Sequence, residues 1–286
     1  MAPAMAPPAR GASAVQALAA PLALHGDDRA LFASDIHLHD ADAGTANAFF
    51  AALAREAATA SHLFLLGDLF EAWVGDDDTS AVGQRLASAL AAISHAGTRV
   101  YLMRGNRDFL LDVALERAHD AIDPNADTPP FSARCGATML ADPCPAVLFD
   151  TPALLAHGDA FCTDDAAYQA FRAQTRSADW QREFLRRPLA GRVASARALR
   201  ARSESEKADK AEYLMDVNTG AVERAMRAVG ARLLIHGHTH RPAVHRFALD
   251  GTQAQRWVLP DWEAHGARGG MLLATRDGLR PIGHWG

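Results

Sequence analysis

The stretch HLFLLGDLFEAW, residues 62–73, joins an apolar run of strand length to a single carboxylate. The run ends at Gly67, and Asp68 follows it directly. Glycine permits the tight turn that a side chain needs in order to project from the end of a strand. A carboxylate has two oxygens and can bridge two cations, as a two-metal hydrolytic site requires. Taken alone, the stretch is more typical of a strand that ends in an aspartate turn, so the metal hypothesis rests on further clusters.

Two of these clusters also follow short apolar runs. The run at residues 30–34 is followed by Asp35 and His37, and strand alternation predicts that both side chains face the same side, where they can hold one ion. The run at residues 99–103 is followed by Asn106, whose carbonyl can bind a divalent cation without adding charge. Each segment by itself also fits a surface turn.

Arg107 follows Asn106 directly and offers a forked guanidinium to any anion that the metals bind. The alternative is a surface salt bridge between Arg107 and Asp108. Both interpretations stay open at this level.

Histidines follow two later strand signals. His157 comes after residues 153–156, and a lone histidine there is more often structural than a ligand. Residues 236–240 read HGHTH after the apolar run 231–235, so His238 and His240 can each give a nitrogen to a different ion. This cluster is the strongest metal signal in the chain.

The periodicity between the clusters indicates an α/β fold, because strands and helices alternate and the polar clusters stand where strands end. Helical spacing predicts helices over residues 45–60 and 82–96. The acidic residues Glu71 and Asp76 to Asp78 could be metal ligands but fit a solvated, helix-capping turn better. Further strands are expected at residues 146–149, 153–156, 244–247, 256–259 and 271–275, the last three as antiparallel strands that complete a second sheet, and a charged helical region is expected over 164–228.

Composition sets outer bounds on the function. The chain has 286 residues, of which 49% are hydrophobic and 22% charged, as in ordinary globular proteins that can bury a full core. Its net charge of −5 gives no global basic field for nucleic acid. Three cysteines without metal-finger spacing fit a reducing compartment. Residues 1–27, rich in Ala and Pro, are expected to be a disordered tail without a secretory signal, which leaves 28–286 as the folded domain.

In chain order the clusters read D-x-H, G-D, G-N-R-D, H-G-D and G-H-T-H. That order resembles the calcineurin-like metallophosphoesterases over about residues 31–275, except that Arg107 stands where most of the superfamily has a catalytic histidine. The segments GDLFEAWVGDD, HGDAFCTDDAAYQAFR and IHGHTHRPAVH make the chain similar, within that superfamily, to the UDP-2,3-diacylglucosamine diphosphatase family of Gram-negative lipid A synthesis.

This resemblance implies a metallophosphoesterase β-sandwich flanked by helices, with a helical lid inserted at about residues 165–215. It implies two Mn²⁺ ions with Asp68 as the shared ligand. One ion would be held by Asp35, His37, Asp68 and His240, and the other by Asp68, Asn106, His157 and His238. The implied reaction cleaves the pyrophosphate of UDP-2,3-diacylglucosamine into UMP and 2,3-diacylglucosamine 1-phosphate, with Arg107 and Asp68 as catalytic residues.

The resemblance also implies substrate contacts and a location. The implied substrate-binding residues are Asn106, Arg107, Asp165, Ser203, Lys207, Lys210 and His238, although the family often has asparagine at the position of Lys207. Because the substrate carries two acyl chains, we expect a peripheral protein on the cytoplasmic side of the inner membrane, with no obligate protein partner. The charged insert fits either solvated helix faces or a lid that meets a membrane, and in the second case arginines such as Arg186, Arg187 and Arg192 would contact anionic lipid.

Two other functions remain open from the sequence. One is a different hydrolase on the same scaffold, such as a nucleotide or nucleic-acid phosphoesterase, which the acidic net charge and the Trp-, Leu- and Arg-rich insert disfavour. The other is a binding scaffold with a decayed site, which the presence of all seven metal-ligand residues disfavours.

Overall fold

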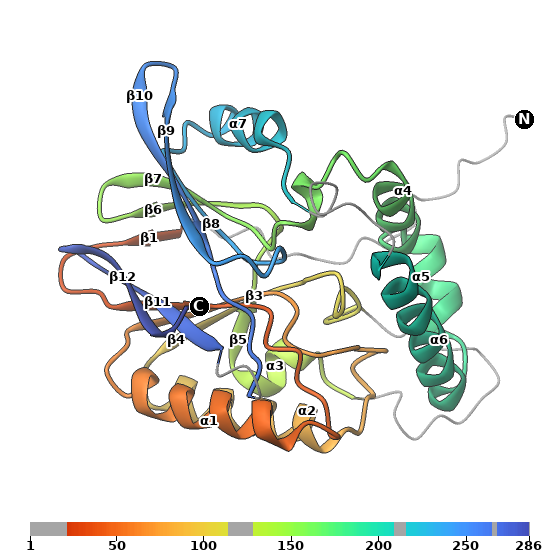
Figure 1. The fold of residues 1–286 in the computed structure, drawn as a ribbon. Coiled ribbons are helices and arrows are strands. Elements are labelled where there is room, and N and C mark those ends of the chain that lie inside the picture. Colours follow the sequence, from red (N-terminus) through yellow and green to blue (C-terminus); the bar gives the residue numbers. More distant parts are fainter. Residues whose placement is uncertain (1–21, 114–127, 209–215, 265–267, 286) are drawn as a thin grey trace, which may run out of the picture.

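The computed structural model describes residues 22–113, 128–208, 216–264 and 268–285, with the side chains of 202–208 outside this description. Two six-stranded mixed sheets pack face to face, and helices cover their outer faces (Figure 1). This arrangement confirms the predicted helix-flanked β-sandwich.

The first sheet contains the three strands that begin the predicted α/β order. Its strands, in spatial order, are β12 (Gly278–His284), β11 (Gly269–Thr275), β2 (Ala30–Ala33), β3 (His62–Leu66), β4 (Arg99–Met103) and β5 (Ala137–Met139). The strands β2 to β5 are mutually parallel, so their carboxyl ends lie at one edge of the sheet.

The second sheet brings the later clusters to the same region. Its strands, in spatial order, are β1 (Leu22–Leu24), β6 (Cys144–Leu148), β7 (Thr151–Leu155), β8 (Leu233–His236), β10 (Thr252–Val258) and β9 (Ala243–Leu249). The strands predicted at residues 146–149 and 153–156 are confirmed as β6 and β7, which form an antiparallel hairpin. The strand β8 is parallel to both β7 and β10.

The helices lie outside the sheets or beside them. They are α1 (Ala43–Ala57), α2 (Ala81–His95), α3 (Phe131–Cys135), the 3-10 turn η1 (Asp159–Phe161), α4 (Ala166–Thr175), α5 (Ala178–Leu185), α6 (Leu189–Ala208) and α7 (Thr219–Ala228). The helices α4 to α6 stand together at the right of Figure 1, and they occupy the part of the chain predicted as a helical insert.

Alternation along β3 explains why its sequence is apolar throughout. Leu63 and Leu65 pack into the core cluster that contains residues of α1 and α2, whereas Phe64 and Leu66 pack into the core between the sheets. A parallel strand that is covered on both faces has no solvated side, so it carries a continuous apolar run. The ring of Phe64 stacks on Phe32 of β2 at a centroid distance of 4.6 Å, which fixes the spacing of these strands.

Two features of the strands differ from the expectation. The predicted tail is shorter, because Leu22–Leu24 forms β1, which pairs in parallel with β6 and is largely buried. The three tail strands do not form one sheet: β9 and β10 join β8, whereas β11 joins β2 and β12. These pairings connect residues far apart in sequence, so local periodicity could not assign them.

Two aspartates of the acidic turn, Asp76 and Asp77, are buried, although the sequence predicted a solvated turn. Asp76 and Asp77 are each 5% exposed. The carboxylate of Asp76 accepts a hydrogen bond from Nε1 of Trp73, and that of Asp77 pairs with Arg192 of α6. Arg192 is itself 2% exposed, so it cannot contact a lipid surface as the sequence interpretation supposed.

Candidate metal centre

The predicted ligands stand on an unusual backbone. Five of the predicted ligands, none of them a glycine, have positive φ angles between 52° and 70°: Asp35, His37, Asp68, His238 and His240. Left-handed backbone is disfavoured for residues with a Cβ and clusters at functional sites, where the surrounding structure enforces it. The fold therefore holds these side chains in a conformation that the local sequence alone would avoid.

The loop after β2 is fixed against the loop after β3. The amides of Ile36 and His37 both donate to the carbonyl of Asp68, at 2.8 and 3.0 Å. Since β2 ends at Ala33, the shared direction of Asp35 and His37 comes from this loop and not from the strand alternation that we expected.

Glycine is required where two of these loops meet. A Cβ on Gly105 would lie 2.1 Å from Oδ1 of Asp68, and a Cβ on Gly237 would lie 2.0 Å from Oδ2 of Asp35. Such distances are impossible for real atoms, so any side chain at either position would displace a predicted ligand. The glycines of the G-N-R-D and G-H-T-H motifs thus set how closely the carboxylates approach the neighbouring loops.

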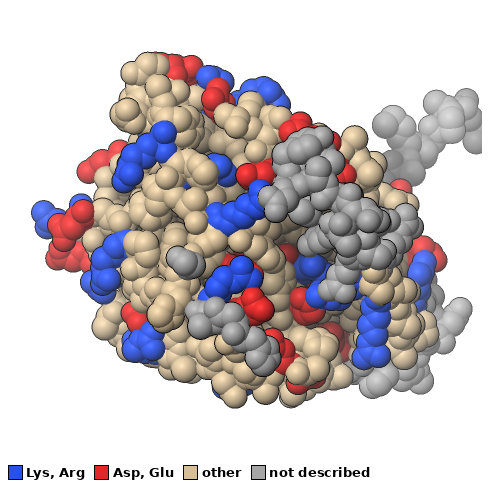
Figure 2. Space-filling model, viewed as in Figure 1, with Lys and Arg blue, Asp and Glu red and all other residues tan. Residues whose placement is uncertain are grey.

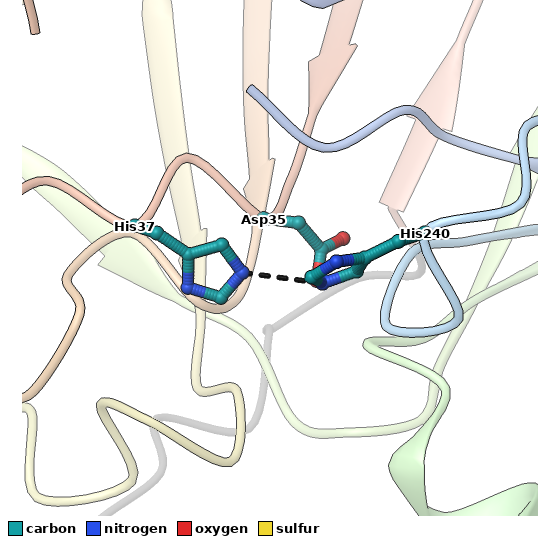
Figure 3. A group of neighbouring side chains, drawn as sticks. All are labelled: Asp35, His37 and His240. Atoms are coloured by element: carbon teal, nitrogen blue, oxygen red, sulfur yellow. Dashed lines mark hydrogen bonds and ion pairs between the residues drawn. The ribbon is translucent and has the colours of Figure 1, made fainter. Parts of the chain in front are cut away.

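One group of donors consists of Asp35, His37 and His240, whose possible ligand atoms lie within 4.8 Å of one another (Figure 3). Nε2 of His37 lies 3.2 Å from Nε2 of His240. Nε2 of His240 also lies 3.4 Å from Oδ1 of Asp35. Three side chains from two distant parts of the chain therefore converge on one point.

A second group adjoins the first through Asp35, which forms a possible site with Asp68 and His157 as well. Oδ1 of Asn106 lies 2.9 Å from Nε2 of His157 and 2.8 Å from Nδ1 of His238. All seven residues predicted as metal ligands therefore lie in one place. Asp35 belongs to both groups, so it is a second candidate for a shared ligand beside Asp68.

Three imidazoles have an oxygen near their other ring nitrogen, and for His157 this oxygen is a hydrogen-bond partner. Nδ1 of His157 lies 3.0 Å from the carbonyl of Leu66. Nδ1 of His37 lies 3.4 Å from Glu71, and Nδ1 of His240 lies 3.5 Å from Asp261. An oxygen behind an imidazole in this way is typical of metal-binding histidines, because it fixes the ring and raises its basicity.

Sequence reasoning missed two of these supports. Asp261 carries no local signal, since it reaches His240 from the loop after β10. Asp108 was considered only for a surface salt bridge to Arg107, yet it is 0% exposed and accepts hydrogen bonds from the amides of Gly105 and Leu69, both at 2.6 Å. Its place in the G-N-R-D motif was the signal that could have identified it.

Burial and mutual charge set the protonation of the cluster. Burial lowers the pKa of His37 well below its ordinary value and that of His238 to about 3. Burial also lowers the pKa of His157, but the carboxylates of Asp68 and Asp35 outweigh it and raise that pKa to about 9. For Asp35, burial raises the pKa, but the imidazole of His240, together with those of His157 and His37, outweighs burial and holds the pKa below its usual range.

These donors fit a divalent cation. Within the described part of the chain, Oδ1 of Asp35 is buried and accepts no hydrogen bond. Neutral imidazoles at His37 and His238 and an ionised carboxylate at Asp35 are the forms that bind metals. Nitrogen and oxygen donors together suit several first-row and hard cations, so the set favours a divalent metal without selecting one.

Arg107 lies at the rim of the centre. Its amide donates to Oδ1 of Asp68 at 2.8 Å, and its guanidinium lies 3.4 Å from Glu71. The side chain is 14% exposed, so it is accessible from the site opening yet held by the protein. Its cation is therefore positioned beside the metal centre, where a bound anion would meet it.

The helix α4 is anchored to the centre through Asp159. This buried carboxylate accepts hydrogen bonds from the hydroxyl of Tyr168 and from Nε of Arg172, both at 2.8 Å. Arg176 bonds the same carboxylate at 3.3 Å and the carbonyl of Gly105 at 3.0 Å. Sequence reasoning did not identify this network, although Asp159 belongs to the H-G-D motif.

The predicted substrate contacts are only partly described. Asp165 caps α4 by accepting from the amide of Tyr168 at 2.9 Å. Ser203 and Lys207 lie on α6, with side chains outside the described atoms, and Lys210 lies outside the described residues altogether.

A two-sheet sandwich with Asp, His and Asn side chains gathered beyond its strand ends is the arrangement of a metallophosphoesterase. The chain belongs to the calcineurin-like phosphoesterase family, whose model matches residues 29–242.

Three relatives that bear the same enzyme name are similar to this chain over most of its length. The chain is 45% identical to the UDP-2,3-diacylglucosamine hydrolase of Chromohalobacter salexigens over 81% of its own length and 88% of the relative's. It is 44% identical to the UDP-2,3-diacylglucosamine hydrolase of Bordetella pertussis, over 87% of this chain and 92% of that protein. The enzyme of the same name from Cellvibrio japonicus is 43% identical, with 87% and 96% covered.

Proposed function

We propose that this protein hydrolyses the pyrophosphate bond of UDP-2,3-diacylglucosamine in lipid A biosynthesis, giving UMP and 2,3-diacylglucosamine 1-phosphate. The observation that carries the proposal is the joint placement of the seven predicted metal ligands with Arg107 at their rim. Relatives that share more than two fifths of the sequence bear the name of this hydrolase.

Two Mn²⁺ ions are the proposed cofactors. The first would be held by Asp35, His37, Asp68 and His240, and the second by Asp68, Asn106, His157 and His238. When bound, two such ions lower the pKa of a water molecule and neutralise charge on phosphoryl oxygens. Glu71 and Asp261 hold the imidazoles of His37 and His240 in their orientation during this chemistry.

Arg107 is the proposed partner of the diphosphate. Water attacks the phosphorus attached to uridine in line, and the bond from that phosphorus to the bridging oxygen breaks. The leaving group is a sugar phosphate, which is weakly basic and needs little help from a general acid. The guanidinium of Arg107 instead neutralises the negative charge that grows on the pyrophosphate, which explains an arginine where most of the superfamily has histidine.

The helices α4 to α6 are the proposed lid over the acyl chains. Phe171 on α4 and Leu199 on α6 are 38% and 39% exposed, as a surface that meets acyl chains would require. Asp165, Ser203, Lys207 and Lys210 are the proposed contacts to the head group. Among the helices of the described residues, none is both long and apolar enough to cross a bilayer. We place the protein at the cytoplasmic face of the inner membrane, where it docks through the lid.

The decisive experiment follows turnover and the point of attack together. Purified protein is incubated with UDP-2,3-diacylglucosamine in ¹⁸O-labelled water, with Mn²⁺ or with a chelator. The masses of the products are measured by mass spectrometry. The proposal expects Mn²⁺-dependent turnover with the label in UMP. Label in the sugar phosphate would move the attack to the other phosphorus. Lack of turnover with Mn²⁺ would show that UDP-2,3-diacylglucosamine is not the substrate.

A further inference from the structure

A cavity of about 370 Å³ lies beside the metal centre, next to the loop that carries His238 and His240. Thr239, the residue between these two predicted ligands, lines it. The other walls come from β9, β10 and the loop before β9, and from Asp216 and Trp285. The cavity therefore adjoins the chemistry but is made by residues that neither the metal sites nor the proposed lid contains.

The register of the β9–β10 hairpin determines which side chains face this cavity. Trp257 packs into the core between the sheets, so its neighbour Arg256 points to the opposite face of β10. Arg256 is directly opposite His245 on β9, and both line the cavity. The next position of β9, Arg246, faces the other way and is not among the lining residues.

The polar groups of the cavity are mixed in sign. The carboxylate of Asp216 lies 3.8 Å from the guanidinium of Arg241 and 3.9 Å from that of Arg256. Because the negative charge of Asp216 partly neutralises the two guanidiniums and would repel a phosphate, the cavity is a poor site for a phosphate group. It favours a neutral ligand that offers both hydrogen-bond donors and acceptors.

The remaining walls are apolar and aromatic: Pro242, Ala243, Val258 and Trp285. Ligand pockets typically measure about 300–1,000 Å³ and combine such walls with a few placed polar groups. A uracil ring offers two carbonyl acceptors and one N–H donor on a flat face, and ribose adds hydroxyls. The guanidiniums and the imidazole of His245 can donate to the carbonyls, while Asp216 can accept from an N–H or hydroxyl.

The position of the cavity fits one end of the proposed substrate. The ring of Tyr168 from α4 lies 6.1 Å from that of His238, so the insert approaches the centre on the His238 side. Arg241 and Pro242 of the cavity follow His240 instead. We propose that this cavity receives the uridine end of the substrate while the acylated sugar extends toward the insert. This assignment rests on the proposed function.

The test measures nucleotide binding separately from catalysis. His245→Ala and Arg256→Met are compared with wild type by calorimetric titration of UMP, and separately of inorganic phosphate, into Mn²⁺-loaded protein. Arg256→Met should bind UMP about tenfold more weakly, the loss expected for one hydrogen bond that involves a charged group, and His245→Ala about threefold to tenfold more weakly, as for a neutral hydrogen bond. Phosphate affinity should stay within about twofold, because phosphate alone would not reach the cavity.

Arg246→Ala is the matched control, because it removes an exposed cation from the same strand on the opposite face. It should bind UMP as wild type does. Unchanged UMP affinity in both cavity variants, or equal losses for UMP and phosphate, would overturn the assignment. Turnover of the lipid substrate is measured on the same wild-type preparation, so a failure of the proposed function would show there and not in the titrations.

Discussion

At the scale of single residues, the site depends on backbone conformations that are unfavourable in isolation. Asp35, His37, Asp68, His238 and His240 all have left-handed backbone. Their loops are held by hydrogen bonds such as those from Ile36 and His37 to the Asp68 carbonyl, and by glycines that permit contact without a Cβ. The free energy that folds the two sheets thus also maintains the strained ligands.

Asp68→Ala should abolish turnover and reduce the bound metal from two ions to fewer than one per chain. Oδ1 of Asp68 lies 3.5 Å from Nε2 of His157 and accepts the amide of Arg107, so its loss removes a ligand and loosens its neighbours. Metal content is measured by elemental analysis after gel filtration. Asp277→Ala, which removes an exposed aspartate from the β11–β12 turn, is the control. Two tightly bound ions in the Asp68 variant would show that Asp68 is not the shared ligand.

Arg107→Ala should lower kcat by about 10²-fold, the usual scale for one contact to a developing anion, and leave metal content unchanged. A guanidinium is always cationic and cannot ligate a metal, so its role must lie with the substrate. Steady-state kinetics with metal analysis checks this. Arg107→Lys keeps the positive charge but loses the forked guanidinium, so its kcat should lie between those of wild type and Arg107→Ala. A kcat equal to wild type would exclude Arg107 from the mechanism.

At the scale of elements, the helical insert is joined to the sandwich by buried charges at two points. Arg192 of α6 bonds Asp77 and the carbonyl of Val74. Arg172 of α4 and Arg176, directly after its end, bond Asp159 near His157. Since each anchor contacts a loop that leads to or from the metal centre, the position of the helices and the geometry of the site are connected.

Arg192→Met should lower the free energy of unfolding by about 3–5 kcal/mol, because it leaves the carboxylate of Asp77 buried without its partner. Urea unfolding monitored by circular dichroism gives this value. Arg197→Met on the exposed face of α6 is the control and should change stability little. Replacing Asp77 by Leu in the Arg192 variant should recover part of the loss. A loss below about 1 kcal/mol would mean that water or another cation compensates Asp77.

At the scale of the whole molecule, the site forms where the carboxyl ends of strands from both sheets meet, and α4 to α6 stand at one side of it (Figure 1). In the part of the face that is drawn in colour in Figure 2, basic and acidic side chains are interspersed, in keeping with the net charge of −5. Any attraction to an anionic membrane must therefore be local. Arg186 and Arg187, exposed at the end of α5, are the candidates that remain after the burial of Arg192.

Arg186→Glu combined with Arg187→Glu should weaken binding to vesicles that contain anionic lipid, by about 1 kcal/mol for each cation lost and more for the reversed charge. Hydrolysis of a short-chain, water-soluble analogue should stay near wild type. Vesicle sedimentation at low and high salt measures the first, and steady-state kinetics the second. Arg55→Glu with Arg276→Glu makes the same charge change on exposed arginines of α1 and the β11–β12 turn. If the two double variants sedimented equally with the vesicles, Arg186 and Arg187 would have no specific role in membrane binding.

The sequence by itself determined the elements and the ligand types. Apolar runs predicted β2, β3, β4, β7 and β8, and the clusters that follow them supplied the seven predicted metal ligands that the structure brings together. These features are local, because a strand of this kind is apolar throughout and the residue after it is carried to the edge of the sheet. The order of the motifs also identified the family that the comparisons found.

Only the tertiary structure decided burial, pairing and the partners of the ligands. Asp77 and Arg192 are 115 positions apart and neither is interpretable without the other. The strand β1 became ordered because β6 lay beside it, and Asp261 became the partner of His240 through a loop with no signal of its own. The free energy of a charge or an edge strand depends on which groups exclude water from it. Those groups come from distant parts of the chain, so the periodicity of a local segment cannot contain them.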